Sequence, residues 1–88
     1  MAWTISFTPR ARKALAGLDR SAAARIVATL ERNLAAHADP RAFGKALAGE
    51  KAGFWRYRVG DYRLICRLED DRLVVLVVEV GHRREVYR

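Results

Sequence analysis

The chain has 88 residues, a formal net charge of +7 at pH 7 and 51% hydrophobic residues, and 14 of its 17 basic residues are arginine. This length allows one small domain, while the hydrophobic content excludes a disordered chain. The single cysteine, Cys66, excludes an internal disulfide and a cysteine-rich zinc site. So positive a charge favours a nucleic acid, an anionic surface or an acidic protein as the partner.

The first residues predict a strand followed by a helix. Apolar and polar side chains alternate over residues 3–7, as in a strand with one buried face. No signal peptide or membrane-spanning stretch is evident, so we expect a soluble, cytoplasmic protein. Thr8 has the side chain of a helix cap, Pro9 suits the first helical position, and Gly17 marks the end of the helix.

A second helix should follow almost at once. Asp19 or Ser21 is its expected cap, and apolar residues then recur at helical spacing. Asp39-Pro40 should end this helix, because the residue before a proline disfavours helical geometry. The few residues between the two helices predict an antiparallel helical hairpin.

The second half of the chain predicts a meander of three strands after an irregular connector over residues 41–53. Its strands and turns are expected in this order: residues 54–59, Gly60-Asp61, residues 62–69, Asp70-Asp71 and residues 72–80. The element order βααβββ predicts a single α+β domain over residues 1–88. Its helical hairpin should cover one face of a small, mainly antiparallel sheet.

The dipeptide Gly60-Asp61 is a hairpin signal, because glycine suits the first central position of a type II′ turn. A turn this tight predicts three residue pairs: Val59 with Tyr62, Arg58 with Arg63, and Arg56 with Ile65. Two arginines then lie opposite each other, which destabilises a strand pair by up to ~1 kcal/mol. Such an arrangement makes sense if a polyanion docks on this face.

A two-residue turn at Asp70-Asp71 predicts the register of the second hairpin: Arg67 with Val74, Ile65 with Leu76, and Arg63 with Val78. One sheet face is then apolar and lies under the helices, with Tyr62, Leu64, Cys66, Leu68, Leu73, Val75 and Val77. The opposite face carries a basic surface of Arg56, Arg58, Arg63 and Arg67 beside Ile65, Leu76 and Val78. A bulge or a one-residue slip would redistribute these side chains.

The last eight residues concentrate groups that bind anions or move protons: His82, Arg83, Arg84, Tyr87 and Arg88. Paired carboxylates, a glycine-rich phosphate loop and a serine triad are absent from the sequence. A metal site is not expected, because the two histidines lack neighbouring ligands. We therefore expect phosphodiester chemistry without a metal or cofactor, in which arginines stabilise the transition state. RNA suits this chemistry better than DNA, because its 2′-OH is an internal nucleophile.

Residues 55–64 read WRYRVGDYRL, and residues 80–87 read VGHRREVY. These two segments resemble the RelE branch of the RelE/ParE toxin superfamily. The resemblance extends to Phe7, Pro9, Ala11, Leu15, Leu18, Lys45, Leu47 and Gly49, and it therefore covers essentially the whole chain. It implies a RelE-like, microbial-ribonuclease-like fold and a type II toxin that enters the 70S ribosome and cleaves mRNA in the A site. It also implies neutralisation by an acidic, RelB-like antitoxin.

The resemblance also implies roles for particular residues. Arg63 and Arg83 match arginines that stabilise the transition state, and Tyr87 matches a tyrosine that stacks on or orients the substrate base. Arg58 completes the expected catalytic set, and the expected substrate-binding residues are Arg56, His82, Lys45 and Arg84. Arg56 and Arg58 stand where the best-known member of the family has lysines. Because arginine is a poor general base, His82 is the candidate to fill part of that role.

Two other functions are compatible with the same resemblance. One is a ParE-like toxin that inhibits DNA gyrase without nuclease activity, and the other is a catalytically weak RNA-binding member. The complete set of Arg58, Arg63, Arg83 and Tyr87 favours cleavage, because a gyrase binder has no need for convergent phosphate ligands. A simpler role for the strand arginines is to pair with antitoxin carboxylates or to pack on Ile65.

Overall fold

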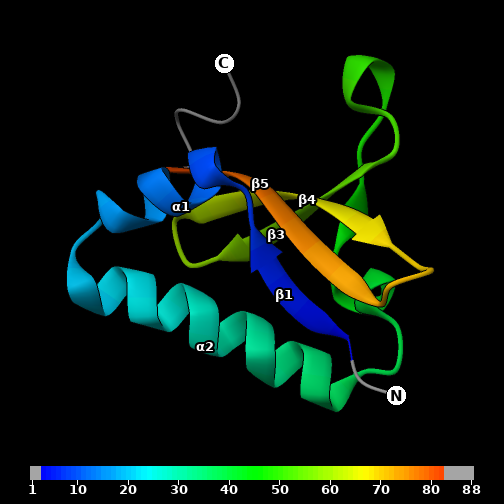
Figure 1. Cartoon of the computed structure of the whole chain (residues 1–88), viewed down its shortest axis with the longest axis horizontal. Helices are drawn as coiled ribbons and strands as arrows, with labels where there is room; N and C mark the ends of the chain where they lie inside the picture. The colour runs from blue at the N-terminus through cyan, green and yellow to red at the C-terminus, as the bar shows by residue number, and fades with distance from the viewer. Residues whose placement is uncertain (1–2, 83–88) are drawn as a thin grey trace.

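The computed structural model describes residues 3–82, which form a five-stranded sheet with two helices on one of its faces (Figure 1). The elements in chain order are β1 (Thr4–Phe7), α1 (Pro9–Ala16), α2 (Arg20–Ala36), the 3-10 helix η1 (Pro40–Phe43), β2 (Lys45–Ala46), the 3-10 helix η2 (Gly49–Lys51), β3 (Phe54–Val59), β4 (Tyr62–Glu69) and β5 (Val74–His82). Within the described range, no helix is long and apolar enough to cross a membrane.

The strand order across the sheet is β1-β5-β4-β3-β2. β1 runs parallel to β5, and all other neighbouring strands are antiparallel. The predicted α+β architecture, with a helical hairpin on a mainly antiparallel sheet, is confirmed. The connector differs from the prediction, because Lys45 and Ala46 form a strand that pairs with Arg56 and Trp55. Two residues are too few to leave a periodic pattern in the sequence.

Both helices begin with a side-chain cap of the predicted kind. The Thr8 hydroxyl accepts a hydrogen bond from the N–H of Ala11 at 3.1 Å. At the second helix, Asp19 Oδ1 accepts from the N–H of Ala22 at 2.8 Å, which decides between the two predicted caps. The chain reverses direction between α1 and α2, as a helical hairpin requires (Figure 1).

The end of α2 is tied to the sheet through η1. The helix stops at Ala36, earlier than the predicted Asp39-Pro40, and Pro40 begins η1 instead. Pro40 is buried, and its carbonyl accepts a hydrogen bond from the Tyr57 hydroxyl at 3.0 Å. A Cβ at Gly44 would lie 2.5 Å from the Tyr57 ring, so this close approach requires a glycine.

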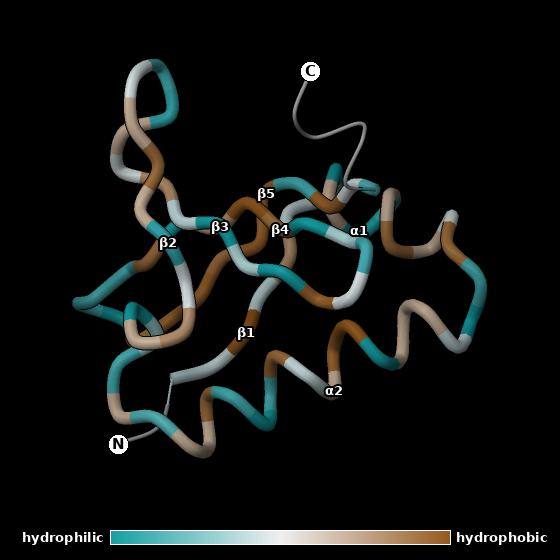
Figure 2. The backbone as a smooth tube through the Cα atoms, turned by 180° about the vertical axis from the view of Figure 1, so that it is seen from behind, coloured by the Kyte–Doolittle hydropathy of each residue, from teal (hydrophilic) through white to brown (hydrophobic). Residues whose placement is uncertain are grey.

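The hydrophobic core fills the space between the helices and the sheet. Its helical members are Ala11, Ile26 and Leu30, and its strand members are Tyr57, Val59, Leu64, Cys66, Val75 and Val77. Hydrophobic and hydrophilic stretches alternate along α2, as in an amphipathic helix (Figure 2). Burying one large aliphatic side chain contributes about 1.5–3 kcal/mol, so packing in this layer stabilises the fold.

The turn between β4 and β5 is longer than predicted. Residues 70–73 form it, in place of a two-residue turn at Asp70-Asp71. Leu73 has a φ of +54°, a left-handed conformation that leucine rarely adopts and that its chemistry does not signal. A bidentate ion pair holds the turn, because Arg41 Nη2 lies 2.7 Å from Asp70 Oδ2 and Nη1 lies 3.0 Å from Oδ1. The guanidinium also holds the pKa of the Asp70 carboxyl below its ordinary value.

The longer turn makes the predicted β4–β5 register wrong. The observed pairs are Arg67 with Leu76, Ile65 with Glu79, and Arg63 with Gly81, and β5 runs to His82. The turn alone shifts β5 by two residues, which leaves Val75 and Val77 on the helix-covered face. An additional bulge beside Ile65/Cys66 then brings Glu79 and Gly81 to the face that was predicted for Val78.

Candidate active site

The turn between β3 and β4 is the two-residue hairpin that the sequence predicts. Gly60 has a φ of +58°, the sign that a type II′ turn requires at its first central position. Any other residue would be strained at this φ, although the only close neighbour of a Cβ there would be Nη2 at the flexible end of Arg25, at 2.9 Å. The predicted pairing of Arg58 with Arg63 is confirmed, and so are the other two predicted pairs.

Strand pairing gathers four of the predicted site residues on the sheet face that the helices do not cover. These residues are Lys45, Arg56, Arg58 and Arg63, and we call this surface the arginine face. One row across it runs Lys45, Arg56, Ile65 and Glu79, and the next row runs Arg58, Arg63 and Gly81. Three successive strands, β2, β3 and β4, therefore contribute cations to one small area.

Exposure divides these cations into two kinds. Lys45 and Arg58 are exposed and Arg56 is half-buried, whereas Arg63 is only 2% exposed. The predicted basic surface is therefore wrong for Arg63, which is buried. The alternation of side chains along a strand predicts the face on which a side chain lies, but not whether other parts of the chain cover it. A buried guanidinium keeps its charge, and its attraction for an anion is stronger where water is excluded.

One carboxylate also belongs to the arginine face. Glu79 is half-buried in the row of Ile65, and its Oε2 lies 3.6 Å from Nζ of Lys51. Lys51 is part of η2, in the connector that projects from the body of the molecule in both views (Figures 1 and 2). The sequence does not identify Lys51 as the partner of Glu79, because connector and strand meet only in the folded chain.

His82 lies on the other face of the sheet. It pairs with Tyr62, and the two rings meet edge to face with centroids 5.8 Å apart. Tyr62 packs against the core under the helices, so the imidazole does not stand among the cations of the arginine face. Its substrate-binding role stays a prediction. The predicted roles of Arg83, Arg84 and Tyr87 fall outside the described residues.

The described side chains that could transfer protons lie mainly under the helices. Burial raises the pKa of the Tyr57 phenol, which donates to the carbonyl of Pro40. Burial likewise raises the pKa of the Cys66 thiol, so this residue is part of the core, as predicted, and not a nucleophile. From residue 3 to residue 82, no group of three or more His, Cys, Asp or Glu side chains could hold a metal. The arginine face is thus equipped to bind and stabilise negative charge.

Comparison with known proteins decides the family. Residues 5–87 match the family described as the ParE toxin of the type II toxin–antitoxin system parDE. This chain belongs to the RelE/ParE toxin superfamily. Toxin RelG from Mycobacterium tuberculosis is 35% identical to it over 88 residues, which are 100% of this chain and 99% of RelG.

The solved structures that this chain resembles include toxins of the RelE type. A chain of the toxin–antitoxin complex RelBE2 from M. tuberculosis has a TM-score of 0.83 and 34% identity, covering 94% of this chain and 100% of that chain. A variant of the E. coli toxin RelE in the free state has a TM-score of 0.75 and 28% identity, covering 99% of this chain and 92% of that chain. The family predicted from residues 55–64 and 80–87 is therefore confirmed, and the toxin is of the RelE type.

Proposed function

We propose that this RelE-type toxin is a ribosome-dependent endoribonuclease, which cleaves mRNA in the A site of the 70S ribosome and so inhibits translation. The observation that carries the proposal is the arginine face, where strand pairing sets Arg58 directly opposite Arg63. Like charges in that position destabilise a sheet, so their presence is best explained by a polyanion that docks there.

The reaction that fits this surface is attack by the 2′-OH of the substrate on its own adjacent phosphorus. A 2′-O–P bond forms and the P–O5′ bond breaks, which leaves a 2′,3′-cyclic phosphate and a 5′-OH end. The 2′-OH gives its proton to a base, and the departing 5′ oxygen gains one. The step needs no metal, because the RNA supplies the nucleophile and guanidinium groups stabilise the pentacovalent transition state.

The chain's residues take the following roles in this proposal. Arg58 and Arg63, together with Arg83, stabilise the reacting phosphate. Tyr87 stacks on or orients a base of the substrate. The residues that bind the neighbouring nucleotides are Arg56, Lys45 and Arg84, and His82 binds the part of the RNA that reaches the other face of the sheet.

Substrate positioning must contribute much of the rate. Guanidinium groups remain protonated at physiological pH, so those of the arginine face act on charge and do not accept the 2′-OH proton. Holding the 2′-OH in line with the scissile bond can replace part of a strong base, and the ribosomal A site is the proposed source of that constraint. The purified toxin should therefore cleave ribosome-bound message well and naked RNA poorly. Efficient digestion of naked RNA would indicate a general ribonuclease instead.

An acidic, RelB-like antitoxin is the proposed partner. The similar RelBE2 chain comes from a toxin–antitoxin complex, and the net charge of +7 on this chain favours an acidic protein. Co-expression with the proposed antitoxin should restore growth and yield a complex. Because both the ribosome and the antitoxin act in the cytoplasm, that is the compartment we propose.

Induction of the toxin in a bacterium tests the proposal. We expect translation to stop within minutes and primer extension to show cuts inside reading frames. A second candidate is inhibition of DNA gyrase, which the match to a family described as ParE toxin favours. DNA-damage signalling with intact mRNA would support that candidate. Toxicity with intact mRNA and no DNA response would identify a catalytically weak RNA-binding member.

A further inference from the structure

The proposed reaction needs a group that accepts the 2′-OH proton, and the cations of the arginine face do not supply it. Guanidinium and ammonium groups ordinarily keep their protons at physiological pH. The described imidazole and phenol groups lie elsewhere, because His82 and Tyr62 meet on the other face of the sheet and Tyr57 is buried under the helices. A carboxylate is the remaining kind of side-chain base.

Glu79 is the carboxylate that strand pairing brings into the arginine face. It lies in the row of Arg56, and two residues before Gly81, which pairs with Arg63. Diagonal neighbours on one face of an antiparallel pair are about 7–8 Å apart, a separation that long side chains can span. Among the described residues, Glu79 is the one carboxylate in the two rows that hold the cations of this face.

The ion pair with Lys51 holds this carboxylate without enclosing it. Lys51 Nζ lies 3.6 Å from Glu79 Oε2, which is longer than a hydrogen bond, and the Glu79 side chain stays 30% exposed. From residue 3 to residue 82, Glu79 makes no further ion pair. A carboxylate has about four lone-pair positions, so a hydroxyl of the substrate can still donate to it.

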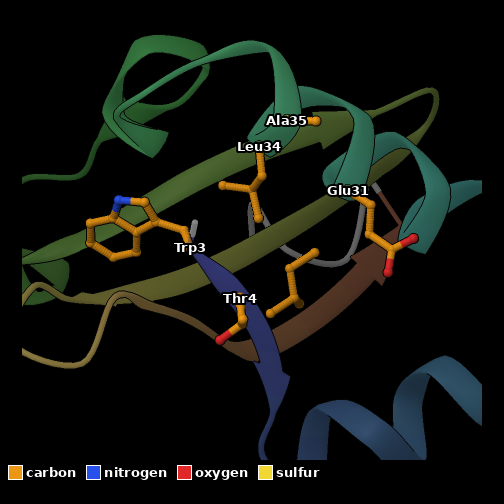
Figure 3. A pocket seen from close by; sticks show the side chains of 6 residues that line it. Trp3, Thr4, Glu31, Leu34 and Ala35 are labelled. Atoms are coloured by element: carbon orange, nitrogen blue, oxygen red, sulfur yellow. The ribbon is translucent and has the colours of Figure 1, made fainter. Parts of the chain in front are cut away.

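Two other glutamates show what distinguishes this position. Glu31 on α2 lines an apolar groove beside β1, together with Leu34 and Trp3 (Figure 3). Glu69 lies at the end of β4, where its Oε1 is 3.0 Å from Nη1 of Arg72. Neither glutamate shares a row with the cations that are proposed to hold the reacting phosphate.

We propose that Glu79 is the general base of the reaction and accepts the 2′-OH proton while the 2′ oxygen attacks phosphorus. This inference rests on the proposed function and adds the proton acceptor to it. As the P–O5′ bond breaks, the departing 5′ oxygen takes a proton from water, and Glu79 then releases its own proton to the solvent. Lys51 is a positioning residue, because its ammonium group orients the carboxylate. A positioned base contributes about 10²–10⁴-fold to the rate.

Single-turnover cleavage of mRNA on 70S ribosomes tests this role. Glu79→Gln keeps the shape of the side chain without the base, so the rate at saturating toxin should fall by about 10²–10³-fold. The toxin concentration at half saturation should not rise, because the loss of a negative charge does not weaken phosphate binding. Glu79→Asp keeps the carboxylate on a shorter side chain and should be intermediate. Thermal unfolding of each variant checks the fold.

Glu69→Gln is the matched control. Glu69 is also a half-buried, ion-paired glutamate of the sheet, so its replacement changes the net charge equally and also breaks one ion pair. Because it lies outside the two rows of cations, Glu69→Gln should cleave at the parental rate. An equal loss of rate in Glu69→Gln and Glu79→Gln would overturn the inference, because net charge would then explain both.

The pH profile separates a base from a structural counter-ion. The charged groups that face Glu79 are those of Lys51, Lys45, Arg56, Arg58 and Arg63. Such side chains ordinarily keep their protons up to about pH 9, so the rate of the parent should be nearly constant between about pH 7.5 and 9. In Glu79→Gln hydroxide must take the proton, so the rate should rise about tenfold per pH unit. Lys51→Ala should be slower with a flat profile, and Lys51→Arg should restore the rate.

Three results would overturn the inference. Cleavage by Glu79→Gln at the parental rate, or at a low rate that does not change with pH, would show that the carboxylate takes no part in proton transfer. A rate that rises with hydroxide in His82→Asn, and not in Glu79→Gln, would assign the proton transfer to the imidazole. Failure of the parent itself to cleave ribosome-bound mRNA would overturn the proposed function, and this inference with it.

Discussion

Arg63 and Leu64 are neighbours on β4 and both are almost completely buried, but they lie on opposite faces of the sheet. Leu64 is part of the apolar layer under the helices, where burial itself stabilises the fold. Arg63 lies opposite Arg58, and like charges directly opposite each other destabilise a strand pair. A contribution to stability therefore explains the presence of Leu64 but not that of Arg63. A residue that does not stabilise the fold is expected to be kept for function.

The largest expected effect on folding is on the helix-covered face. Leu64→Ala removes a side chain with 0% exposure and should lower the free energy of unfolding by about 2–5 kcal/mol. Leu68→Ala, on the same face but half-buried, should cost less. Urea unfolding followed by circular dichroism measures both. Equal losses of stability in the two variants would mean that the difference in burial between Leu64 and Leu68 does not determine how much each side chain stabilises the fold.

Substitution of Arg63 should lower activity and not stability, whereas the effect expected at Leu64 is a loss of stability. Arg63→Met keeps most of the buried volume and removes the repulsion from Arg58, so its stability should equal or exceed that of the parent. Cleavage of ribosome-bound mRNA should fall by about 10²–10³-fold, the usual cost of losing one preorganised donor to a transition-state oxyanion. Arg63→Lys keeps the charge without the planar fork and should be intermediate. An unfolded Arg63→Met variant, or one that cleaves at the parental rate, would show that Arg63 has a structural role.

A comparison of two exposed arginines tests whether cleavage depends on position along the strands. Arg58 lies in the row of Arg63, whereas Arg67 lies in the row of Leu76, nearer the β4–β5 turn. Arg58→Ala should lower the cleavage rate by about 10- to 100-fold, and Arg67→Ala should leave it unchanged. Both variants should keep their stability within ~0.5 kcal/mol of the parent, because both side chains are exposed. An equal effect on cleavage would mean that general positive charge, and not position, drives the reaction.

A smaller loss of stability than at Leu64 is expected at Tyr57, on the helix-covered face. Tyr57→Phe removes the hydrogen bond to Pro40 and should cost about 0.5–1.5 kcal/mol at neutral pH. Burial raises the pKa of Tyr57 in the folded state, so above pH ~10 the unfolded chain loses this proton first. The parent should therefore lose stability above that pH more steeply than Tyr57→Phe. The buried Cys66 thiol adds a similar loss from lower pH in both proteins.

Urea unfolding at pH 8 and pH 11 measures this difference. The gap in stability between the parent and Tyr57→Phe should narrow at the higher pH. A constant gap would mean that Tyr57 titrates alike in the folded and unfolded chains.

The two hairpins show what the sequence could predict. Gly60 is a glycine whose conformation the turn requires, and the register it implied is correct for β3 and β4. The β4–β5 register was missed because Leu73 adopts a positive φ that leucine does not signal. The bulge beside Ile65/Cys66 has no marker either, and it decides that Gly81, and not Val80, lies next to Arg63.

The arginine face was predicted in its composition better than in its arrangement. Alternation placed Arg56, Arg58 and Arg63 on one face, and the family resemblance added Lys45, which β2 brings into the same row as Arg56. The burial of Arg63 depends on what lies over the strand, which strand periodicity does not contain. The position of His82 on the opposite face depends on the same bulge that the sequence did not reveal.

The central claim is that the substrate's own 2′-OH attacks while the arginine face stabilises the phosphate. It is tested most directly on 70S ribosomes programmed with a message that has a single 2′-deoxynucleotide at the cleavage position. The unmodified message should yield a 2′,3′-cyclic phosphate and a 5′-OH end, and the deoxy message should remain intact at that position. Cleavage of both messages at the same rate and the same position would contradict the account.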